Sequence, residues 1–286
     1  MPPETVACAA SLGELARRAT LRLHRAGFER PRREALWLIA GRLGLDPGAI
    51  VLHAERPIPA DLEAWVDRAV ERRVSGEPLA YIAGSAGFRT LDLVVDRRVL
   101  IPRPETEGLV EVALTLTRCG VAADIGVGSG AIALSLAAEG GFGRVIGVEL
   151  SRDALAVARA NRDRVAPGVA LVHGDLVAPL APASVDLLVS NPPYVAIGER
   201  DELDRGVRDY EPALALYGGQ EGHELTTRLL ADARRVVRPG GWLAVEIASA
   251  RAEAAAHAAG EHGWDQVGVA NDSFGRPRYL TARRPR

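Results

Sequence analysis

Apolar residues in the first third of the chain recur at the spacing of α-helices. A first helix is predicted to begin at Ser11, which forms a capping box with Glu14. Two more are predicted from Arg32 to Leu43, ending at Gly44, and from Asp61 to Val74. Each helix is short and has a single apolar stripe, so the helices must pack together as a bundle. Substrate recognition and simple stabilisation are equally compatible with such a bundle.

The pattern changes to a period of two at residues 91–95, which predicts a β-hairpin with turns at Gly84 and Gly87. Pro102 and Pro104 then stiffen the entry into the next helix, as expected of a segment that fixes two domains relative to each other. We therefore expect a helical domain over residues 1–75, a β-hairpin linker over 76–105 and a larger domain over 106–286.

Short apolar runs alternate with helical segments over the rest of the chain. This order predicts an α/β fold with a parallel sheet covered by helices on both faces. Two final strands, near 266–270 and 278–282, are predicted to form a hairpin that adds an antiparallel strand. The charged stretch 199–210 is predicted to be a loop or a short helix, and residues 238–241 a tight turn. The buried strands are predicted at 121–125, 145–149, 170–173, 185–189 and 242–247.

The first of these strands runs into the glycine-rich turn Gly126-Val127-Gly128-Ser129-Gly130, and a helix follows at once. Glycines at this spacing let the backbone turn sharply and leave room for a ligand beside the start of the helix. The spacing G-x-G-x-G differs from the G-x-G-x-x-G of dinucleotide-binding turns. Asp124, just before the first glycine, suits an amino group or a sulfonium better than a pyrophosphate.

Two further acids follow later strands. Glu149 ends the second strand about twenty residues further on, where a carboxylate can accept both ribose hydroxyls of an adenosine. Asp175 and Leu176 follow the third strand and are positioned to flank an adenine ring. For Asp175 the alternative is an acid that only stabilises a turn. Together these residues predict a nucleoside-containing ligand.

A proline-rich corner, Asn191-Pro192-Pro193-Tyr194, follows the strand at 185–189. Two consecutive prolines hold the chain in a fixed extended conformation at the tip of the strand. The Asn191 side chain and the Pro192 carbonyl then offer two acceptors to an incoming NH2 group, with the Tyr194 ring beside them. A rigid turn without chemistry is the plain alternative, and the glycine-rich turn upstream favours the functional interpretation.

Composition excludes some classes of protein and favours others. The chain has 286 residues, 48% of them hydrophobic, so it can bury a sizeable core. A net charge of −2 without a basic stripe disfavours nucleic-acid binding. We see no signal peptide and no apolar run long enough for a bilayer, so we expect a cytoplasmic protein without a membrane partner. Cys8, Cys119 and the six histidines match no metal-ligand spacing, and no metal is expected.

With these motifs the chain resembles the peptide-chain release factor glutamine N5-methyltransferases of the HemK/PrmC family. The resemblance spans nearly the whole chain and is most specific in residues 101–107 and 191–194. It implies a Rossmann-like class I methyltransferase sheet of seven strands that binds S-adenosylmethionine and releases S-adenosylhomocysteine. It also implies a small N-terminal helical-bundle domain joined by the β-hairpin. The implied substrate is the glutamine of the Gly-Gly-Gln motif in class I release factors, and the implied state is a monomer.

The resemblance also assigns roles to individual residues. Glu149 would bind the ribose and Leu176 would lie against the adenine, while Asn191 would touch both cofactor and substrate. The sequence departs from the usual pattern at Val127 (commonly threonine), at Glu149 (commonly aspartate) and at Arg89-Thr90 (commonly an aromatic residue and glycine). The methionine end of the cofactor would lie against Asp124, Ile125, Gly126, Val127 and Gly128, and Pro192, Pro193 and Tyr194 would complete the glutamine pocket.

Orientation is the mechanism that the sequence favours. An amide nitrogen is a poor nucleophile because its lone pair is delocalised, and we see no strong base near Asn191. The corner can instead aim the nitrogen at a sulfonium methyl group. The alternatives are a ribosomal-protein glutamine methyltransferase and a nucleic-acid amino methyltransferase, which share the corner. A nicotinamide dehydrogenase would need a different glycine spacing and a catalytic pair, and a non-enzymatic module would not need the corner.

Overall fold

The computed structural model describes residues 11–286, so Cys8 lies outside the described residues. The chain divides into two compact units, Met1–Gly84 and Ser85–Arg286. No helix among the described residues has the length and apolar character needed to cross a membrane. The domain limits expected at residues 75/76 and 105/106 stay predictions.

The first unit is a helical bundle, as predicted. Ser11 Oγ accepts a hydrogen bond from the Glu14 amide and so caps the first helix, while the Glu14 carboxylate pairs with Arg17. Apolar side chains on the facing stripes form one core, which includes Leu23, Leu38 and Val70. The two shortest helices have no periodic pattern long enough to predict. The helices are α1 Leu12–Arg25, α2 Pro31–Leu43, α3 Pro47–Leu52, α4 Ala60–Val74 and α5 Leu79–Ala83.

The second unit begins with the predicted hairpin, β1 Ser85–Phe88 and β2 Leu91–Val94. Its turn falls on Arg89-Thr90, so the turn predicted at Gly87 is wrong, because Gly87 lies within β1. Arg89 has a φ of 51°. A residue with a side chain is rare in this conformation. Two interactions hold it: the Arg89 amide donates to Glu107, and the guanidinium pairs with Glu139. The departure at Arg89-Thr90 thus keeps the hairpin by other means than glycine.

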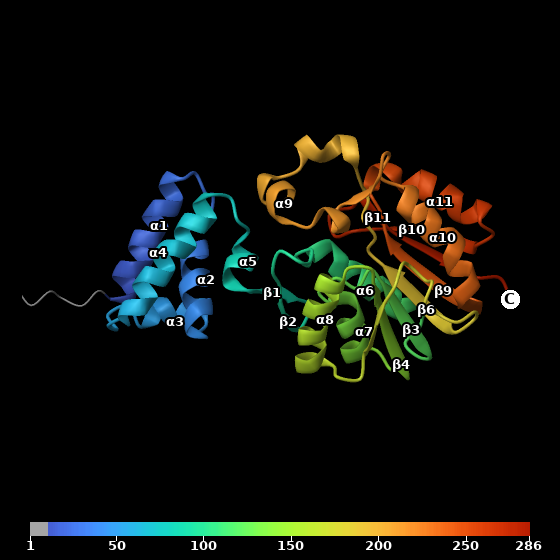
Figure 1. Ribbon diagram of the computed structural model, residues 1–286, viewed down its shortest axis with the longest axis horizontal. Coiled ribbons are helices and arrows are strands. Elements are labelled where there is room, and N and C mark those ends of the chain that lie inside the picture. Colours follow the sequence, from blue (N-terminus) through green and yellow to red (C-terminus); the bar gives the residue numbers. More distant parts are fainter. Residues whose placement is uncertain (1–10) are drawn as a thin grey trace, which may run out of the picture. The chain divides into compact units, whose positions relative to one another are not determined.

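The predicted sheet has seven strands in the order β10-β11-β9-β6-β3-β4-β5 (Figure 1). The five adjacent strands from β9 to β5 are parallel to one another, and β11 runs antiparallel to both β9 and β10. The chain order reverses between β3 and β6, where open α/β sheets bind ligands at the carboxyl ends of their strands. The strands are β3 Val121–Ile125, β4 Arg144–Glu149, β5 Ala170–His173, β6 Val185–Ser190, β9 Val237–Glu246, β10 Asp265–Asn271 and β11 Pro277–Arg283.

Helices cover both faces of the sheet. One face packs against α6 Pro104–Leu116, α7 Ala131–Glu139 and α8 Arg152–Val165, together with the hairpin. The opposite face packs against α10 Glu224–Val236 and α11 Ala252–Glu261. In Figure 1 the first set is green and the second orange to red. Successive strand residues such as Leu187 and Leu188 alternate between the two cores, which explains why the central strands are apolar throughout.

The segment between β6 and α10 contains short elements. The charged stretch predicted as a loop or short helix forms the 3₁₀ helix η1 Ile197–Glu202 and α9 Arg205–Tyr210. A further 3₁₀ turn, η2 Ala213–Ala215, precedes β8 Tyr217–Gly219, which pairs in parallel with β7 Val195–Ala196, the short strand before η1. Another 3₁₀ turn, η3 Ser249–Arg251, leads into α11.

The predicted tight turn at 238–241 is wrong as a separate element, because these residues belong to β9. The register between β6 and β9 shifts between Val185 and Leu187, so the additional residues of β9 are taken up in an irregularity. Gly240 has a φ of 79° there, and its amide donates to the Arg284 carbonyl. The strand therefore continues through a glycine that suggested a chain reversal.

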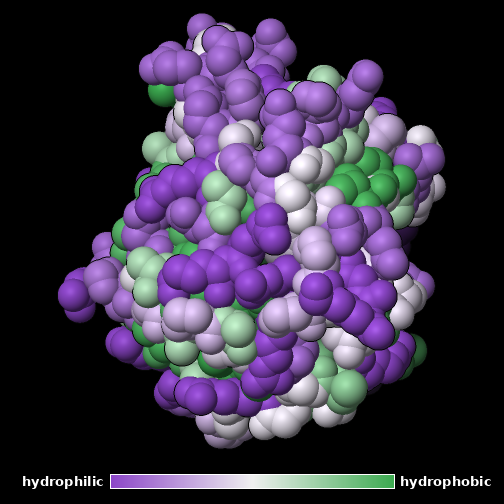
Figure 2. All heavy atoms as spheres, turned by 90° about the vertical axis from the view of Figure 1, so that its right-hand side faces the viewer, coloured by the Kyte–Doolittle hydropathy of each residue, from purple (hydrophilic) through white to green (hydrophobic). Residues whose placement is uncertain are grey.

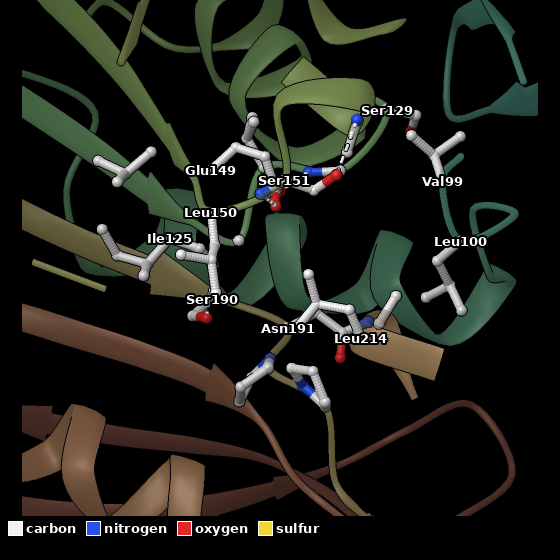
Figure 3. A pocket seen from close by; sticks show the side chains of 18 of the residues that line it. Val99, Leu100, Ile125, Ser129, Glu149, Leu150, Ser151, Ser190, Asn191 and Leu214 are labelled. Carbon is white, nitrogen blue, oxygen red and sulfur yellow. Dashed lines mark hydrogen bonds between the residues drawn. The ribbon is translucent and has the colours of Figure 1, made fainter. Parts of the chain in front are cut away.

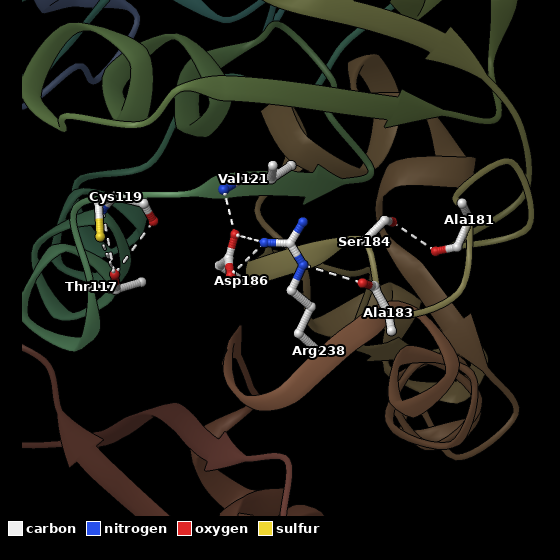
Figure 4. Close-up of polar contacts among 8 residues, drawn as sticks. All are labelled: Thr117, Cys119, Val121, Ala181, Ala183, Ser184, Asp186 and Arg238. Carbon is white, nitrogen blue, oxygen red and sulfur yellow. Dashed lines mark hydrogen bonds and ion pairs between the residues drawn. The ribbon is translucent and has the colours of Figure 1, made fainter. Parts of the chain in front are cut away.

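A polar cross-link joins strands at the amino edge of the sheet, opposite the ligand-binding edge (Figure 4). The Val121 amide donates to Asp186 Oδ2 at 2.7 Å, and Arg238 Nη1 lies 2.8 Å from the same oxygen. Arg238 also donates to the Ala183 carbonyl. Asp186 thus fixes β3 beside β6. Away from these contacts, the face in Figure 2 is mostly polar with smaller apolar patches, as expected once apolar side chains have filled a core.

Candidate active site

A cavity opens at the carboxyl ends of β3, β4 and β6, in the second unit (Figure 3). Ten of the twelve predicted site residues line it, and Asp124 and Tyr194 do not. Residues from the segment before α8 and from the segment around η2 complete the wall. The predicted residues in the lining are Ile125, Gly126, Val127, Gly128, Glu149, Asp175, Leu176, Asn191, Pro192 and Pro193.

The glycine-rich turn forms one wall of the cavity. Gly126 has a φ of 77° and Gly128 a φ of 53°, conformations that glycine adopts without strain. A Cβ placed on Gly126 would meet no heavy atom within 4 Å. Since Gly126 lines the cavity, that open space is space for a ligand. The turn therefore leaves open space at the cavity wall, and the close approach of its backbone to a ligand stays a prediction.

Asp124 lies behind this turn and is 1% exposed. Its Oδ2 accepts a hydrogen bond of 3.0 Å from the Ala133 amide in the first turn of α7, and its Oδ1 has no partner among the described residues. Burial raises the pKa of Asp124 to about 7. Asp124 thus fixes α7 against β3 and does not line the cavity, and its expected contact with the cofactor stays a prediction.

Glu149 faces the cavity and is held by backbone groups. Its Oε2 accepts from the Gly128 amide and its Oε1 from the Ser151 amide, each at 2.9 Å. Each carboxylate oxygen keeps a second lone pair for a further donor. A carboxylate fixed in this way presents two acceptors in a rigid arrangement, which is what the two hydroxyls of a ribose need.

Asp175 and Leu176 lie at the end of the cavity beyond β5. Asp175 forms an ion pair of 2.6 Å with Arg228 on α10, and both side chains are about half exposed. Leu176 has a φ of 46°, an uncommon conformation for a branched side chain. The ion pair with Arg228 is typical of an acid that stabilises a turn, whereas the place of Asp175 in the cavity lining is typical of a residue that binds a ligand.

The corner after β6 provides the polar end of the cavity. Asn191 Nδ2 donates to Thr106 Oγ1 at 3.0 Å, and Thr106 Oγ1 donates to Glu246 Oε2 at 2.7 Å. The Asn191 amide nitrogen therefore has a protein partner, and its Oδ1 is left to accept from a ligand. Pro192 and Pro193 line the same wall.

Tyr194 turns away from the lining toward the same acid. Its hydroxyl donates to Glu246 Oε1 over 3.4 Å, and burial raises the pKa of Tyr194 to about 12. The phenol is therefore neutral at physiological pH. The direct substrate contact expected for Tyr194 stays a prediction.

Glu246 and Thr106 are site residues that the sequence reasoning missed. Glu246 is fully buried at the end of β9, and burial raises its pKa to about 7. An acid that closes the apolar run 242–245 was the available signal, because a buried strand seldom ends in an unpaired carboxyl. Thr106 lies in the specific block 101–107, for which the sequence predicted only a stiff linking role and no part in the site.

A second missed pair flanks the cavity mouth. Arg103 lines the cavity and its Nη2 lies 2.6 Å from Glu211 Oε1. The Glu211 side chain is 1% exposed, and burial raises its pKa. Pro212, which follows Glu211, lines the cavity too. The ion pair therefore fastens the segment around η2 to the residues that precede α6.

Comparisons with known proteins agree over nearly the whole length. Residues 14–84 match the PrmC N-terminal domain, and residues 106–204 match the methyltransferase small domain. A release factor glutamine methyltransferase of Mycolicibacterium smegmatis is 41% identical over 276 residues, 93% of this chain and 95% of that protein. One of Streptomyces coelicolor is 40% identical over 283 residues, 96% of this chain and 98% of that protein.

A solved structure supports the fold. The crystal structure of a methyltransferase from Pyrococcus furiosus has a TM-score of 0.53 and 22% identity, and the match covers 68% of this chain and 90% of that one. At this identity the likeness concerns the fold alone. The seven-stranded sheet described above therefore has the class I methyltransferase fold.

Proposed function

The chain belongs to the family of release factor glutamine methyltransferases, and from that premise we propose its reaction in detail. It transfers a methyl group from S-adenosylmethionine to the side-chain nitrogen of the glutamine in the Gly-Gly-Gln motif of class I release factors. The observation that supports this most directly is that Asn191 Oδ1 has no hydrogen-bond partner among the described residues, while Asn191 and Pro192 line the cavity at the switch point of the sheet. The position suits an incoming primary amide.

The lining fits S-adenosylmethionine. The open space beside Gly126 accommodates the methionine end, the two fixed oxygens of Glu149 suit the ribose, and Leu176 offers an apolar surface to the adenine. Asp175 lies beside the adenine end, and Ile125, Val127 and Gly128 complete the wall. Asp124 supports the turn from behind. When bound, S-adenosylmethionine supplies a methyl group on a positively charged sulfur.

Asn191 and Pro192 orient the substrate nitrogen. Asn191 Oδ1 and the Pro192 carbonyl accept the two amide hydrogens, so the nitrogen faces the methyl group. Orientation of reacting groups can supply on the order of 7–11 kcal/mol in favourable cases. The nitrogen forms its new bond to carbon while the carbon–sulfur bond breaks, and it then loses one proton to solvent. No side chain has to remove that proton beforehand, because the nitrogen becomes acidic only after methylation.

Two buried acids with raised pKa values are candidates for a base, but neither lines the cavity. Asp124 lies behind the glycine-rich turn and Glu246 lies behind Thr106. A general base must be within hydrogen-bond reach of the proton that it removes. The locations of Asp124 and Glu246 therefore favour a role in holding neighbouring groups in place over a role as a general base.

The relatives' names favour release factors over ribosomal proteins as the substrate class, and over nucleic acids. The remaining parts of the proposal are a cytoplasmic monomer that contacts no nucleic acid directly, with Tyr194 and Pro193 shaping the glutamine pocket. The N-terminal helices would then serve substrate recognition.

Mass spectrometry of a class I release factor tests the proposal. An unmethylated factor is incubated with the protein and S-adenosylmethionine, and the Gly-Gly-Gln peptide should gain one methyl mass on the glutamine. A factor with that glutamine changed to glutamate is the matched control and should gain none. Asn191→Ala should nearly abolish turnover while the dissociation constant for S-adenosylhomocysteine changes less than threefold, roughly the limit expected for a group that acts in the transition state. Methyl transfer to RNA or to a ribosomal protein in place of the release factor would refute the proposal.

A further inference from the structure

We propose that Glu246 and Thr106 are positioning residues, which set the direction of the Asn191 carboxamide through a chain of directed hydrogen bonds. We call these three residues the Asn191 relay. The inference deepens the proposed function and rests on it, since it explains why Asn191 presents an acceptor and not a donor to the substrate.

The relay joins parts of the chain that are far apart in sequence. Thr106 is in the first turn of α6, Asn191 follows β6, and Glu246 is the last residue of β9. The two hydrogen bonds measure 3.0 Å from Asn191 to Thr106 and 2.7 Å from Thr106 to Glu246. Thr106 is 5% exposed and Glu246 is fully buried. Water therefore has little access to compete for the hydrogen bond between Thr106 and Glu246.

The direction of the relay follows from the donors and acceptors available. Above its pKa of about 7, Glu246 is an ionised carboxylate that only accepts hydrogen bonds, so the Thr106 hydroxyl must then donate to Glu246. Its oxygen can then only accept, and the group that faces it on Asn191 must be the NH2. The carbonyl Oδ1 of Asn191 is thereby left for the substrate. Without the relay, the terminal torsion of asparagine is broad and nearly two-fold, so both orientations would be populated.

The inverted orientation is unproductive. It would present the Asn191 NH2 to the substrate NH2, two donors facing each other, and the amide would lose an acceptor. Half-populated inversion costs little, but a preference for the inverted form would remove most productive complexes. The relay removes this choice before the substrate arrives.

Glu246 also receives the Tyr194 hydroxyl at 3.4 Å. The buried Glu246 carboxylate therefore contacts Tyr194 directly and Asn191 through Thr106. Replacing buried polar partners by apolar residues of similar size is often neutral or stabilising, so stability alone is a weak reason for an acid at this position. An acceptor that orders Asn191 is a sufficient reason.

A matched pair of substitutions tests the relay. Thr106→Ser keeps the hydroxyl, and Thr106→Val keeps the shape but lacks it. We expect kcat to fall at least about twofold in T106V, the cost of equal population of the two Asn191 orientations, and to stay at the wild-type value in T106S. The KM for release factor and the dissociation constant for S-adenosylhomocysteine should be nearly unchanged in both. Glu246→Gln, whose carbonyl can still accept from Thr106, should retain more activity than Glu246→Leu.

A second comparison separates positioning from a general structural effect. If Thr106 acts through Asn191, then T106V should cause no further loss in the residual activity of Asn191→Ala, measured with labelled methyl groups. A full additional loss in the double variant, or equal activity of T106V and T106S in the wild-type background, would overturn the proposal.

A readout without substrate keeps this test independent of the proposed function. The side-chain NH2 resonance of Asn191, assigned by its loss in Asn191→Asp, should exchange slowly with solvent in the wild-type protein and in T106S. It should exchange faster in T106V. Unchanged exchange in T106V would overturn the relay even if release factor were methylated, whereas a protein that methylates no release factor but shows the difference would overturn only the proposed function.

Discussion

Gly126→Ala should separate the cost of backbone strain from the loss of ligand space. Gly126 has a φ of 77°, and alanine in a left-handed conformation costs roughly 1–2 kcal/mol of folding free energy. This strain is the same in the free and the liganded protein, so it cancels in a binding constant. The new methyl group meets no protein atom within 4 Å and projects into open space at the cavity wall.

The expected loss of affinity follows from that position. Forcing one methyl group into a packed contact costs about 1–3 kcal/mol, and about 1.4 kcal/mol corresponds to a factor of ten. Calorimetric titration with S-adenosylhomocysteine should therefore give a dissociation constant about 5- to 150-fold higher in the variant. Thermal unfolding of the same sample reports the strain.

Gly275→Ala is the matched control. Gly275 is in the turn between β10 and β11 with a φ of 78°, and a Cβ there also meets nothing within 4 Å. It does not line the cavity. The two variants should lose similar stability, and only Gly126→Ala should lose affinity. Equal affinity in Gly126→Ala and wild type would refute the assignment of this space to the ligand.

Two further predictions concern buried charges. Burial raises the pKa of Asp124 from 3.8, and that of Glu246 from 4.5, to about 7, although the hydrogen bond from Thr106 and the charge of Arg278 partly lower the pKa of Glu246. The folded state therefore keeps protons that the unfolded state has released, and the free energy of unfolding should fall as pH rises from about 4 to about 7. Denaturant titrations across this range should show a smaller slope in Asp124→Asn, and an unchanged slope would contradict the raised pKa. Arg103→Met leaves the buried Glu211 carboxyl unpaired and should lower the free energy of unfolding by about 3 kcal/mol. The exposed pair of Arg17 with Glu14 provides the control, since Arg17→Met should cost less than about 0.5 kcal/mol, and equal losses in the two variants would contradict the role of burial.

The fold was predictable where the chain repeats a pattern long enough to read. Apolar runs bounded by turn residues predicted the strands of the central sheet, and single apolar stripes predicted the long helices of the bundle. The elements that were missed are short: α3 has six residues, α5 five and β7 two. Such segments depend on packing against the rest of the fold, which no local pattern encodes.

The site was predictable only where function follows directly from a strand end. The glycine-rich turn and Asn191 come immediately after a strand and Glu149 is the last residue of one, and the carboxyl ends of parallel strands meet at one edge. Thr106 was not predictable in the same way, since it is separated from Asn191 by 85 residues and from Glu246 by 140. The order of the strands across the sheet brings these side chains together, and the order is not a local property.

The position of Glu246 has a chemical advantage that goes beyond orientation. A carboxylate oxygen is itself a nucleophile, and it is a better one than an amide nitrogen. If Glu246 lined the cavity beside the activated methyl group, it would compete with the substrate for that group. Thr106 lies between the Glu246 carboxyl and Asn191. Its hydroxyl donates to Glu246 and accepts from the Asn191 NH2, which fixes the orientation of the Asn191 carboxamide while the carboxyl stays fully buried. A neutral hydroxyl between a buried acid and an asparagine thus gives the corner a fixed acceptor without placing a second methyl acceptor in the site.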